Sequence, residues 1–440
     1  MPWRWWNESA GVNPGRVVSS TPRSPAWWVP SLYFAQGLPY GVVMALSVVM
    51  YKNLGLSNTE IALYTSWLYL PWVIKPLWAP LVDLLRTKRL WIVGLQAVIG
   101  AALAALALTL PLSGVVQASL ALFWLLAFAS ATHDIAADGF YMLALPEHAQ
   151  AAYVGVRSLF YRVAMIATQG GLVYLAGWLM QSGASAVRAW QAVMLILGAL
   201  FVLLFAWHQA VLPRPPSDRG RAGDRPLLAA FMHTFASFFK RQDIALVLGF
   251  LLLFRLGEAQ LVKLVTPFLL DARSAGGLGL STAEVGLVYG TVGVIALTCG
   301  GLAGGLVISR HGLKRWLWTM VLAIHLPDLL FVALAHWQPT HLGFITAAVA
   351  LEQFGYGFGF AAYLLYMIFV AEGESKTAHY ALCTGFMALG MMLPGMASGW
   401  LQERLGYTNF FIWVCLATLP SIVLTRWLRI PAAFGARARA

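Results

Sequence analysis

The chain of 440 residues is 60% hydrophobic and only 10% charged. In a soluble domain roughly a quarter of all residues are charged. In this chain the apolar residues extend along almost the whole length. This composition excludes an ordinary soluble protein and predicts a polytopic membrane protein. The net charge of +12 does not indicate nucleic-acid binding, because the basic residues lie in short loops between apolar segments.

The three cysteines also carry little chemistry. Cys299, Cys383 and Cys415 all fall in apolar stretches, are too few for a disulfide framework and lack metal-ligand spacing. We therefore expect packing roles for them, and neither a metal site nor a cofactor.

Residues 1–28 contain no apolar core of a signal peptide and are rich in Pro, Ser, Gly and Arg. They predict a disordered cytoplasmic tail. The following apolar segments predict an all-α membrane protein of about twelve transmembrane helices, since a hydrocarbon core of about 30 Å needs about 20 helical residues. The expected helices cover 30–52, 57–82, 90–111, 116–143, 151–179, 188–212, 243–270, 282–308, 314–336, 341–370, 378–401 and 409–429.

Basic residues collect in alternate loops, which predicts that both termini are cytoplasmic. The longest polar stretch, PRPPSDRGRAGDRP at 213–226, lies near the middle of the chain. It divides the sequence into two six-helix bundles, 29–212 and 243–430, joined by a cytoplasmic linker at 213–242 and followed by a short tail at 431–440.

This plan resembles that of the major facilitator superfamily. The superfamily's loop signature, G-x-L-x-D-R-x-G-x-K/R, is matched in part at equivalent places in both halves. GLVISRHGLKR at 305–315 keeps Gly305, Arg310, Gly312 and Lys314, and APLVDLLRTKR at 79–89 keeps Asp83 and the basic cluster.

Six further segments are informative: FAQGLPYG (34–41), VIKPLWAPLVD (73–83), SATHDIAADGF (130–140), FYRVAM (160–165), FRLGEA (254–259) and LEQFGYGFG (351–359). Through them the chain resembles the AmpG-type permeases, which carry muropeptides into the cytoplasm of Gram-negative bacteria and are related to acetyl-CoA transporters. The resemblance implies a transporter driven by the proton gradient.

The fourth predicted helix contains His133, Asp134 and Asp138. Charged groups in lipid are costly unless they are paired, and the two acids lie one helical turn apart on one face. On the next, antiparallel helix, Arg157 and Arg162 have matching depths. We expect the pairs Asp138–Arg157 and Asp134–Arg162. Either they only join the two helices, or Asp134 titrates while Asp138 belongs to a gate. His133 either relays protons or, as we expect, bonds to a neighbouring backbone group.

The second half offers further charged groups. Arg255 and Glu258 are three residues apart and can pair within one helix. Glu258 and Glu352 are the rivals of Asp134 as the proton-carrying acid, whereas His325 and Asp328 are expected to form a structural pair. The predicted coupling residues are therefore Asp134, Glu258, Glu352, Arg162 and Arg255, and the predicted cytoplasmic gate contains Asp138, Arg157, Asp83, Arg86 and Arg310.

A substrate cavity is predicted from a bend and from aromatic faces. Pro39 between glycines in QGLPYG removes a backbone hydrogen bond, and bent helices line transporter cavities, although a packing kink is equally compatible. Lys75 either snorkels to the surface or meets anionic cargo. The candidate lining residues are Gln36, Tyr40, Tyr64, Trp67, Lys75, Gln353, Tyr356 and Tyr363.

These features predict a proton-coupled importer of the bacterial inner membrane that works as a monomer by alternating access. Its partners would be a small-molecule substrate, protons and membrane lipid, and the favoured substrate is a muropeptide or another saccharide-containing compound. A transporter of a siderophore or of a nucleotide-linked carrier such as acetyl-CoA is the alternative. A sensor without net flux and an enzyme acting on lipid-linked sugars are further alternatives, although no nucleophile motif stands out.

Overall fold

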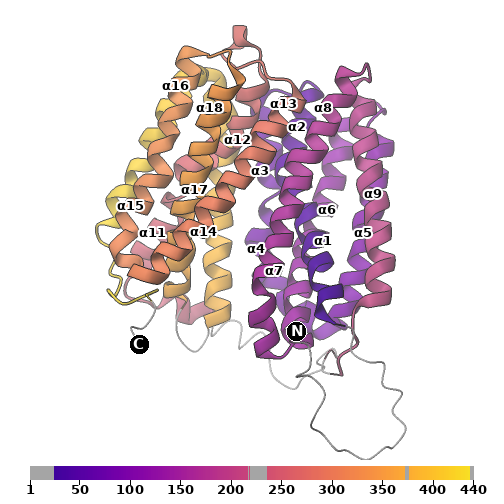
Figure 1. Cartoon of the computed structure of the whole chain (residues 1–440), viewed down its shortest axis with the longest axis vertical. Coiled ribbons are helices and arrows are strands. Elements are labelled where there is room, and N and C mark those ends of the chain that lie inside the picture. Colours follow the sequence, from indigo (N-terminus) through magenta and orange to yellow (C-terminus); the bar gives the residue numbers. More distant parts are fainter. Residues whose placement is uncertain (1–23, 217, 219–234, 372–375, 437–440) are drawn as a thin grey trace, which may run out of the picture.

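The computed structural model describes residues 24–216, 218, 235–371 and 376–436, and within these ranges the ordered elements are helices, with no strand. Figure 1 shows two bundles side by side, the first half of the chain in indigo to magenta and the second half in orange to yellow. The two-bundle architecture predicted from the sequence is confirmed by this arrangement.

The N-terminal bundle begins at a short 3₁₀ turn, η1 (Pro25–Trp27), and its first helix contains a π-helical segment. Its elements are α1 (Val29–Gly41), η2 (Val42–Leu46), α2 (Ser47–Asn53), α3 (Asn58–Trp67), α4 (Leu70–Leu85), α5 (Lys88–Thr109), α6 (Val115–Ala144), α7 (Glu147–Ile166), η3 (Ala167–Leu172), α8 (Val173–Gln181) and α9 (Ala186–Val211).

The C-terminal bundle is built in the same way, with several interrupted helices. Its elements are α11 (Ile244–Leu253), α12 (Leu256–Leu270), η4 (Arg273–Ala275), α13 (Thr282–Val285), η5 (Gly286–Gly293), α14 (Val294–His311), α15 (Leu313–His325), η6 (Leu326–Asp328), α16 (Leu329–Trp337), α17 (Leu342–Val370) and α18 (Lys376–Thr425).

Ten segments of the described chain are long and apolar enough to cross a membrane. In addition, α3 and α4 follow one another over residues 58–85, and α18 is interrupted at Gly406, where a φ of 73° is not helical. The number of twelve spans and the cytoplasmic position of the termini stay predictions.

The two halves repeat a helix start that sequence inspection had not singled out. Leu-Ser-Asn-Thr-Glu at 56–60 precedes α3, and Leu-Ser-Thr-Ala-Glu at 280–284 opens α13. In each, the serine hydroxyl accepts a bond from the glutamate backbone N–H, and the glutamate carboxylate accepts one from the serine backbone N–H. These reciprocal capping boxes satisfy N–H groups that have no partner within the helix, at equivalent places in the two bundles.

The boundaries of the predicted tails shift slightly. Residues 25–28 were expected to be disordered, but they form η1 and end at Trp28, which is buried against Phe140. At the other terminus Phe434 packs on Phe369, and its carbonyl accepts a bond from the backbone of Leu313. The rest of the predicted tails, 1–23 and 437–440, and most of the linker lie outside the described residues.

The bundles are joined mainly at the end opposite to these terminal segments, near the top of Figure 1, where α13 lies against α8 and α3 against α18. Lys52 forms an ion pair with Asp271 at 2.6 Å, and the Asn58 amide donates to Gln402 and Tyr407. We call this end the closed end.

Glycines allow the backbones to meet at the closed end. A Cβ on Gly399 of α18 would overlap the carbonyl oxygen of Asn58, and one on Gly290 of η5 would overlap that of Gln169. Since both neighbouring atoms belong to backbone, neither can move aside as a flexible side chain would. The bundles can therefore make contact here only because glycine has no side chain at these two positions.

We expect Gly399→Val to shift the protein away from the state in which this end is closed. Overpacking costs about 1–3 kcal/mol, which corresponds to about a 5-fold to 100-fold change in the equilibrium. The measurement is the yield of a short chemical cross-link between cysteines placed at Thr59 and Glu403, whose side chains are 2.6 Å apart across the two bundles. The native cysteines are replaced in all samples.

Gly94→Val is the matched control, because a Cβ there meets nothing within 4 Å. Its cross-linking should equal that of the parent protein. Equal yields from Gly399→Val and the parent would contradict the role assigned to this glycine.

Candidate functional site

Asp134 of α6 is paired with Lys75 of α4, and the amide nitrogen of Gln36 of α1 donates to its other carboxylate oxygen. Both ionic groups keep some accessible surface, 28% for the Lys75 side chain and 20% for that of Asp134. Three helices of the N-terminal bundle therefore meet at one carboxylate. The predicted pair Asp134–Arg162 is wrong, because the acid turns toward α4 and α1 rather than toward α7.

Asp138 lies one turn further along α6, and its predicted pair with Arg157 is confirmed by a distance of 2.9 Å between Nη2 and Oδ1. The hydroxyl of Tyr33 donates to the same oxygen at 3.1 Å. The Arg157 guanidinium also lies over the ring of Tyr33, 4.5 Å from its centre. An acid, an arginine and an aromatic ring thus join α1, α6 and α7 near the end of the bundle opposite to the closed end.

Residues of the two bundles come together around Tyr40 of α1. Its electrostatic neighbours include Asp134 and Arg162 from the N-terminal bundle and Arg255 and Tyr356 from the C-terminal bundle. Tyr69, Trp72 and Tyr161 add aromatic faces beside Tyr40. We call this group of charged and aromatic side chains the central cluster.

Arg255 stands at the break between α11 and α12 and is buried. Its Nη2 donates to the hydroxyl of Tyr356 at 3.1 Å, and the guanidinium carbon lies 5.2 Å from the ring centre of Phe360. Its Nη1 has no hydrogen-bond partner among the described residues. The predicted ion pair with Glu258 does not form: the guanidinium bonds to Tyr356 instead, and neither oxygen of Glu258 has a hydrogen-bond partner among the described residues.

Lys263 is also buried at the contact between bundles. Its ammonium donates to the hydroxyl of Thr65 at 2.9 Å and lies 5.1 Å from the ring centre of Tyr69. Together with Arg162 and Arg255, it is a cation with no carboxylate within 4.0 Å among the described side chains.

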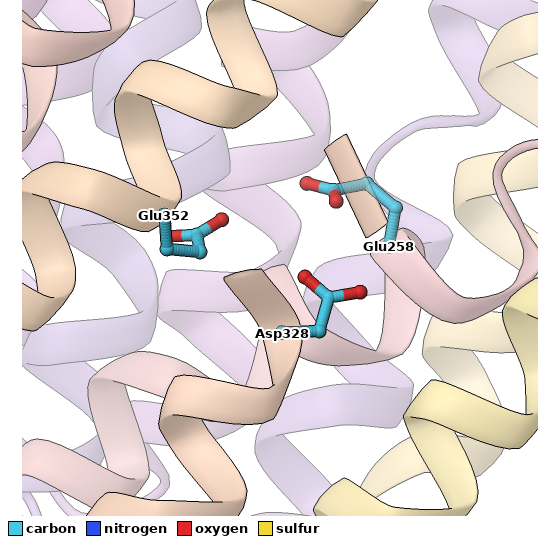
Figure 2. Close-up of side chains that lie close together, drawn as sticks. All are labelled: Glu258, Asp328 and Glu352. Atoms are coloured by element: carbon cyan, nitrogen blue, oxygen red, sulfur yellow. The ribbon is translucent and has the colours of Figure 1, made fainter. Parts of the chain in front are cut away.

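Glu258, Asp328 and Glu352 form a second group, the carboxylate cluster, in the C-terminal bundle. Figure 2 shows the three side chains pointing toward one another from separate helical elements. One oxygen from each lies within 4.8 Å of the others, and all three residues are buried. The expected His325–Asp328 pair is wrong, because the His325 Nε2 instead faces the Ser421 hydroxyl at 3.0 Å.

The remaining predicted residues are distributed over several places. Gln353 donates to Glu352 at 3.0 Å, whereas Tyr363 packs in the core of the C-terminal bundle and donates to the carbonyl of Leu251. Tyr64 is half-buried and Trp67 is 40% exposed. Among the predicted gate residues, Arg86 and Arg310 are exposed at helix ends, and the side chain of Asp83 lies outside the described ones.

His133 also differs from its predicted backbone contact. Its Nε2 lies 3.1 Å from the side-chain nitrogen of Gln96, whose oxygen lies 2.9 Å from Nδ1 of His208. The His208 Nε2 reaches the hydroxyl of Ser31 at 3.0 Å. Side chains of four helices thus form one polar chain, of which Gln96, His133 and His208 are buried. In the sequence, Gln96 and His208 had stood out only as polar residues in apolar segments.

Two bundles of membrane-length helices with buried charged groups where they meet are typical of a polytopic membrane transporter. The chain belongs to the Major Facilitator Superfamily, whose family model matches residues 31–323, and this family indicates a transporter rather than an enzyme. As a multi-pass transporter with AmpG-type relatives, it is consistent with a location in the bacterial inner membrane.

Among similar curated proteins, the "Anhydromuropeptide permease" of Escherichia coli strain K12 is 27% identical over 403 residues, which are 89% of this chain and 77% of that protein. The "Putative transporter AmpG 4" of Rickettsia conorii is 24% identical over 415 residues, 90% of this chain and 94% of the relative.

Solved transporters share the fold. The nucleoside transporter NupG, as a D323A mutant, superposes with a TM-score of 0.69 at 17% identity and covers 91% of this chain and 97% of its own. A D-xylose–proton symporter superposes with a TM-score of 0.65 at 14% identity, covering 93% and 98%.

We expect Lys75→Met to destabilise the protein, because it leaves the Asp134 carboxylate with only Gln36 as a partner. An unpaired polar group costs about 1–3 kcal/mol, and partial exposure favours the lower part of that range. Combining it with Asp134→Asn should recover most of the loss. Thermal unfolding in detergent measures both effects, and the control is Arg310→Met, at an exposed arginine that forms no ion pair with the described residues. A double variant as unstable as Lys75→Met alone would show that the pair does not account for the cost.

Proposed function

We propose that this transporter imports an anionic, saccharide-containing solute such as a muropeptide, driven by the proton gradient. The observation that carries the proposal is the central cluster, where cations and aromatic rings from both bundles surround Tyr40. A solute held there touches both halves, so its binding can be linked to their relative movement.

The charges of the central cluster favour an anion. Arg162 and Arg255 have no carboxylate within ion-pair distance, and the Nη1 of Arg255 has no protein partner among the described residues. A guanidinium binds carboxylates and phosphates through two parallel hydrogen bonds. A carboxylate of the solute would complete Arg255 without breaking an existing ion pair.

The aromatic groups favour rings in the same solute. Tyr40 contacts Trp72 edge to face, with 5.3 Å between ring centres, and Tyr161 lies beside it. In the C-terminal bundle, Phe360 and Tyr356 cover Arg255. A muropeptide combines sugar rings with peptide carboxylates, and the curated relative named "Anhydromuropeptide permease" supports this class.

The mode of action follows from the closed end. The bundles touch near Lys52 and Asp271, while the basic loops after α4 and α14 lie at the opposite end. If these loops are cytoplasmic, as the positive-inside rule indicates, the structure represents a state closed to the outside. Import then requires the closed end to separate, in a rocking movement of one bundle against the other.

A nucleotide-linked carrier such as acetyl-CoA is the second candidate, since its phosphates would equally suit Arg162 and Arg255. Uptake of labelled anhydromuropeptide, acetyl-CoA and a neutral oligosaccharide into proteoliposomes separates the candidates. We expect the muropeptide to accumulate only when the outside is more acidic. Equal uptake with and without the pH gradient would refute proton coupling, and preferential uptake of acetyl-CoA would replace the substrate.

Arg255→Gln should weaken binding of the anionic solute by about 10-fold to 100-fold, because a hydrogen bond to a charged group contributes about 1.5–3 kcal/mol. The affinity of Arg255→Lys should lie between those of the parent protein and Arg255→Gln, since an ammonium keeps the charge but not the paired donors. The matched control is Arg404→Gln, whose guanidinium lies over the ring of Trp400 on the exposed surface. Calorimetric titration gives the affinities, and an unchanged affinity in Arg255→Gln would remove this residue from the binding site.

A further inference from the structure

The carboxylate cluster is separate from the ion pairs of the N-terminal bundle. Its acids are not paired with basic side chains as Asp134 and Asp138 are. Glu258 and Asp328 are fully buried, and Glu352 is 1% exposed. Neither oxygen of Glu258 or of Asp328 has a hydrogen-bond partner among the described residues, and Glu352 receives one bond, from Gln353. A buried carboxylate without a partner is strongly disfavoured, so three together point to a positively charged ligand.

The groups around the cluster do not supply enough positive charge. Arg255, at the start of α12, acts electrostatically on Glu258 and on His325. The other neighbours are uncharged when protonated: Tyr289 of η5, Tyr356 of α17, Tyr69 ahead of α4 and Cys415 of α18. With three carboxylates ionised and Arg255 charged, the cluster would carry two excess negative charges, which one divalent ion or two protons would balance.

The geometry suits a metal ion of moderate size. Three oxygens that are separated by at most 4.8 Å always share a point that lies no further than about 2.8 Å from each, which is 4.8 Å divided by the square root of three. Calcium takes oxygen ligands at about 2.3–2.6 Å with flexible geometry, whereas magnesium requires about 2.0–2.1 Å in a strict octahedron. Three carboxylates held on separate helical elements impose no octahedron, so the longer and more flexible bonds of calcium suit them better than those of magnesium.

The cluster also lies at interruptions of the helices. Glu258 belongs to the first turn of α12, directly after the break at Arg255, and Asp328 ends the 3₁₀ turn η6 that contains Pro327. Glu352 is on the continuous α17, which crosses beside them. Discontinuous helices are where transporters bind coupling ions, since short segments can turn while the rest of the helix stays packed.

We propose that Glu258, Asp328 and Glu352 form a site for one divalent cation, with calcium preferred over magnesium, in competition with protons. Two protons replace one divalent ion. The site is an additional feature of the C-terminal bundle, and only its link to transport rests on the proposed function. Binding of the ion joins α12, η6 and α17, and protonation releases them from one another.

The test is calorimetric titration of the full-length protein in detergent with calcium chloride, magnesium chloride or choline chloride, at several pH values. We expect calcium to bind at pH 8 and more tightly than magnesium, whereas choline gives no signal. Because up to two protons compete with each ion, the calcium affinity should fall by up to about 100-fold for each unit of decrease in pH once the acids protonate.

Glu258→Gln, Asp328→Asn and Glu352→Gln keep the side-chain shapes and should each weaken calcium binding at least 10-fold. Asp138→Asn removes a membrane carboxylate that is already paired with Arg157 and is the matched control for calcium affinity. Size-exclusion profiles and thermal unfolding establish that each variant is folded.

Several results would overturn the proposal. The first is an absence of calcium binding to the wild-type protein at pH 8, a result that needs no variant. The others are tighter binding of magnesium than of calcium, a calcium affinity that does not change with pH, and a loss of calcium affinity in Asp138→Asn as large as in the three cluster variants. Proton-driven uptake into proteoliposomes would stand in each of these cases. Conversely, calcium binding with the expected pH dependence would survive a failure of every substrate tried.

Discussion

The structure depends on one electrostatic constraint: a charge inside an apolar helix bundle must find a compensating group. In the N-terminal bundle this requirement ties helices together, since Asp134 holds α6 to α4 and α1, and Asp138 holds α6 to α7. In the C-terminal bundle the acids at 258, 328 and 352 face one another instead. The two halves share a fold but solve the same problem differently: ion pairs compensate Asp134 and Asp138 in the first half, whereas the three clustered acids of the second half have no cation within ion-pair distance among the described residues.

Contact between the halves follows a second rule, close approach of backbones. Gly399 lies where α18 meets α3, and Gly290 lies where η5 meets η3. Neither has a side chain to keep the backbones apart, so the closed end is sealed by main-chain surfaces and a few polar bonds around Asn58. Such a contact buries little flexible side chain, and its separation also breaks the bond from the buried Lys263 ammonium to Thr65. The Lys52–Asp271 pair is compatible with separation, because both groups remain partly exposed.

Sequence reasoning reached the fold because hydrophobic length and loop charge are local properties. It also found Asp138–Arg157, since depth along two consecutive antiparallel helices follows from residue counting. The same counting failed for Asp134, because it compares only neighbours in sequence, whereas Lys75 arrives from α4. Predicting the carboxylate cluster would have required knowing how α12, η6 and α17 are oriented toward each other. The helix breaks at Arg255 and Pro327 set this orientation, and the residue pattern does not tell in which direction a helix turns at such a break.

The difference between the halves bears on what moves during transport. Lys75 already neutralises Asp134, so taking up a proton there would mean giving up an ion pair as well as gaining a proton. The acids of the carboxylate cluster have no such ion pair. A positive charge that enters the cluster therefore relieves the repulsion between the carboxylates without breaking an ion pair. Arg255 belongs to the central cluster, where it bonds to Tyr356, and it also interacts electrostatically with Glu258 of the carboxylate cluster. A change of charge at Glu258 therefore alters the field at the guanidinium that would hold an anionic solute, and the two events are linked through a single side chain.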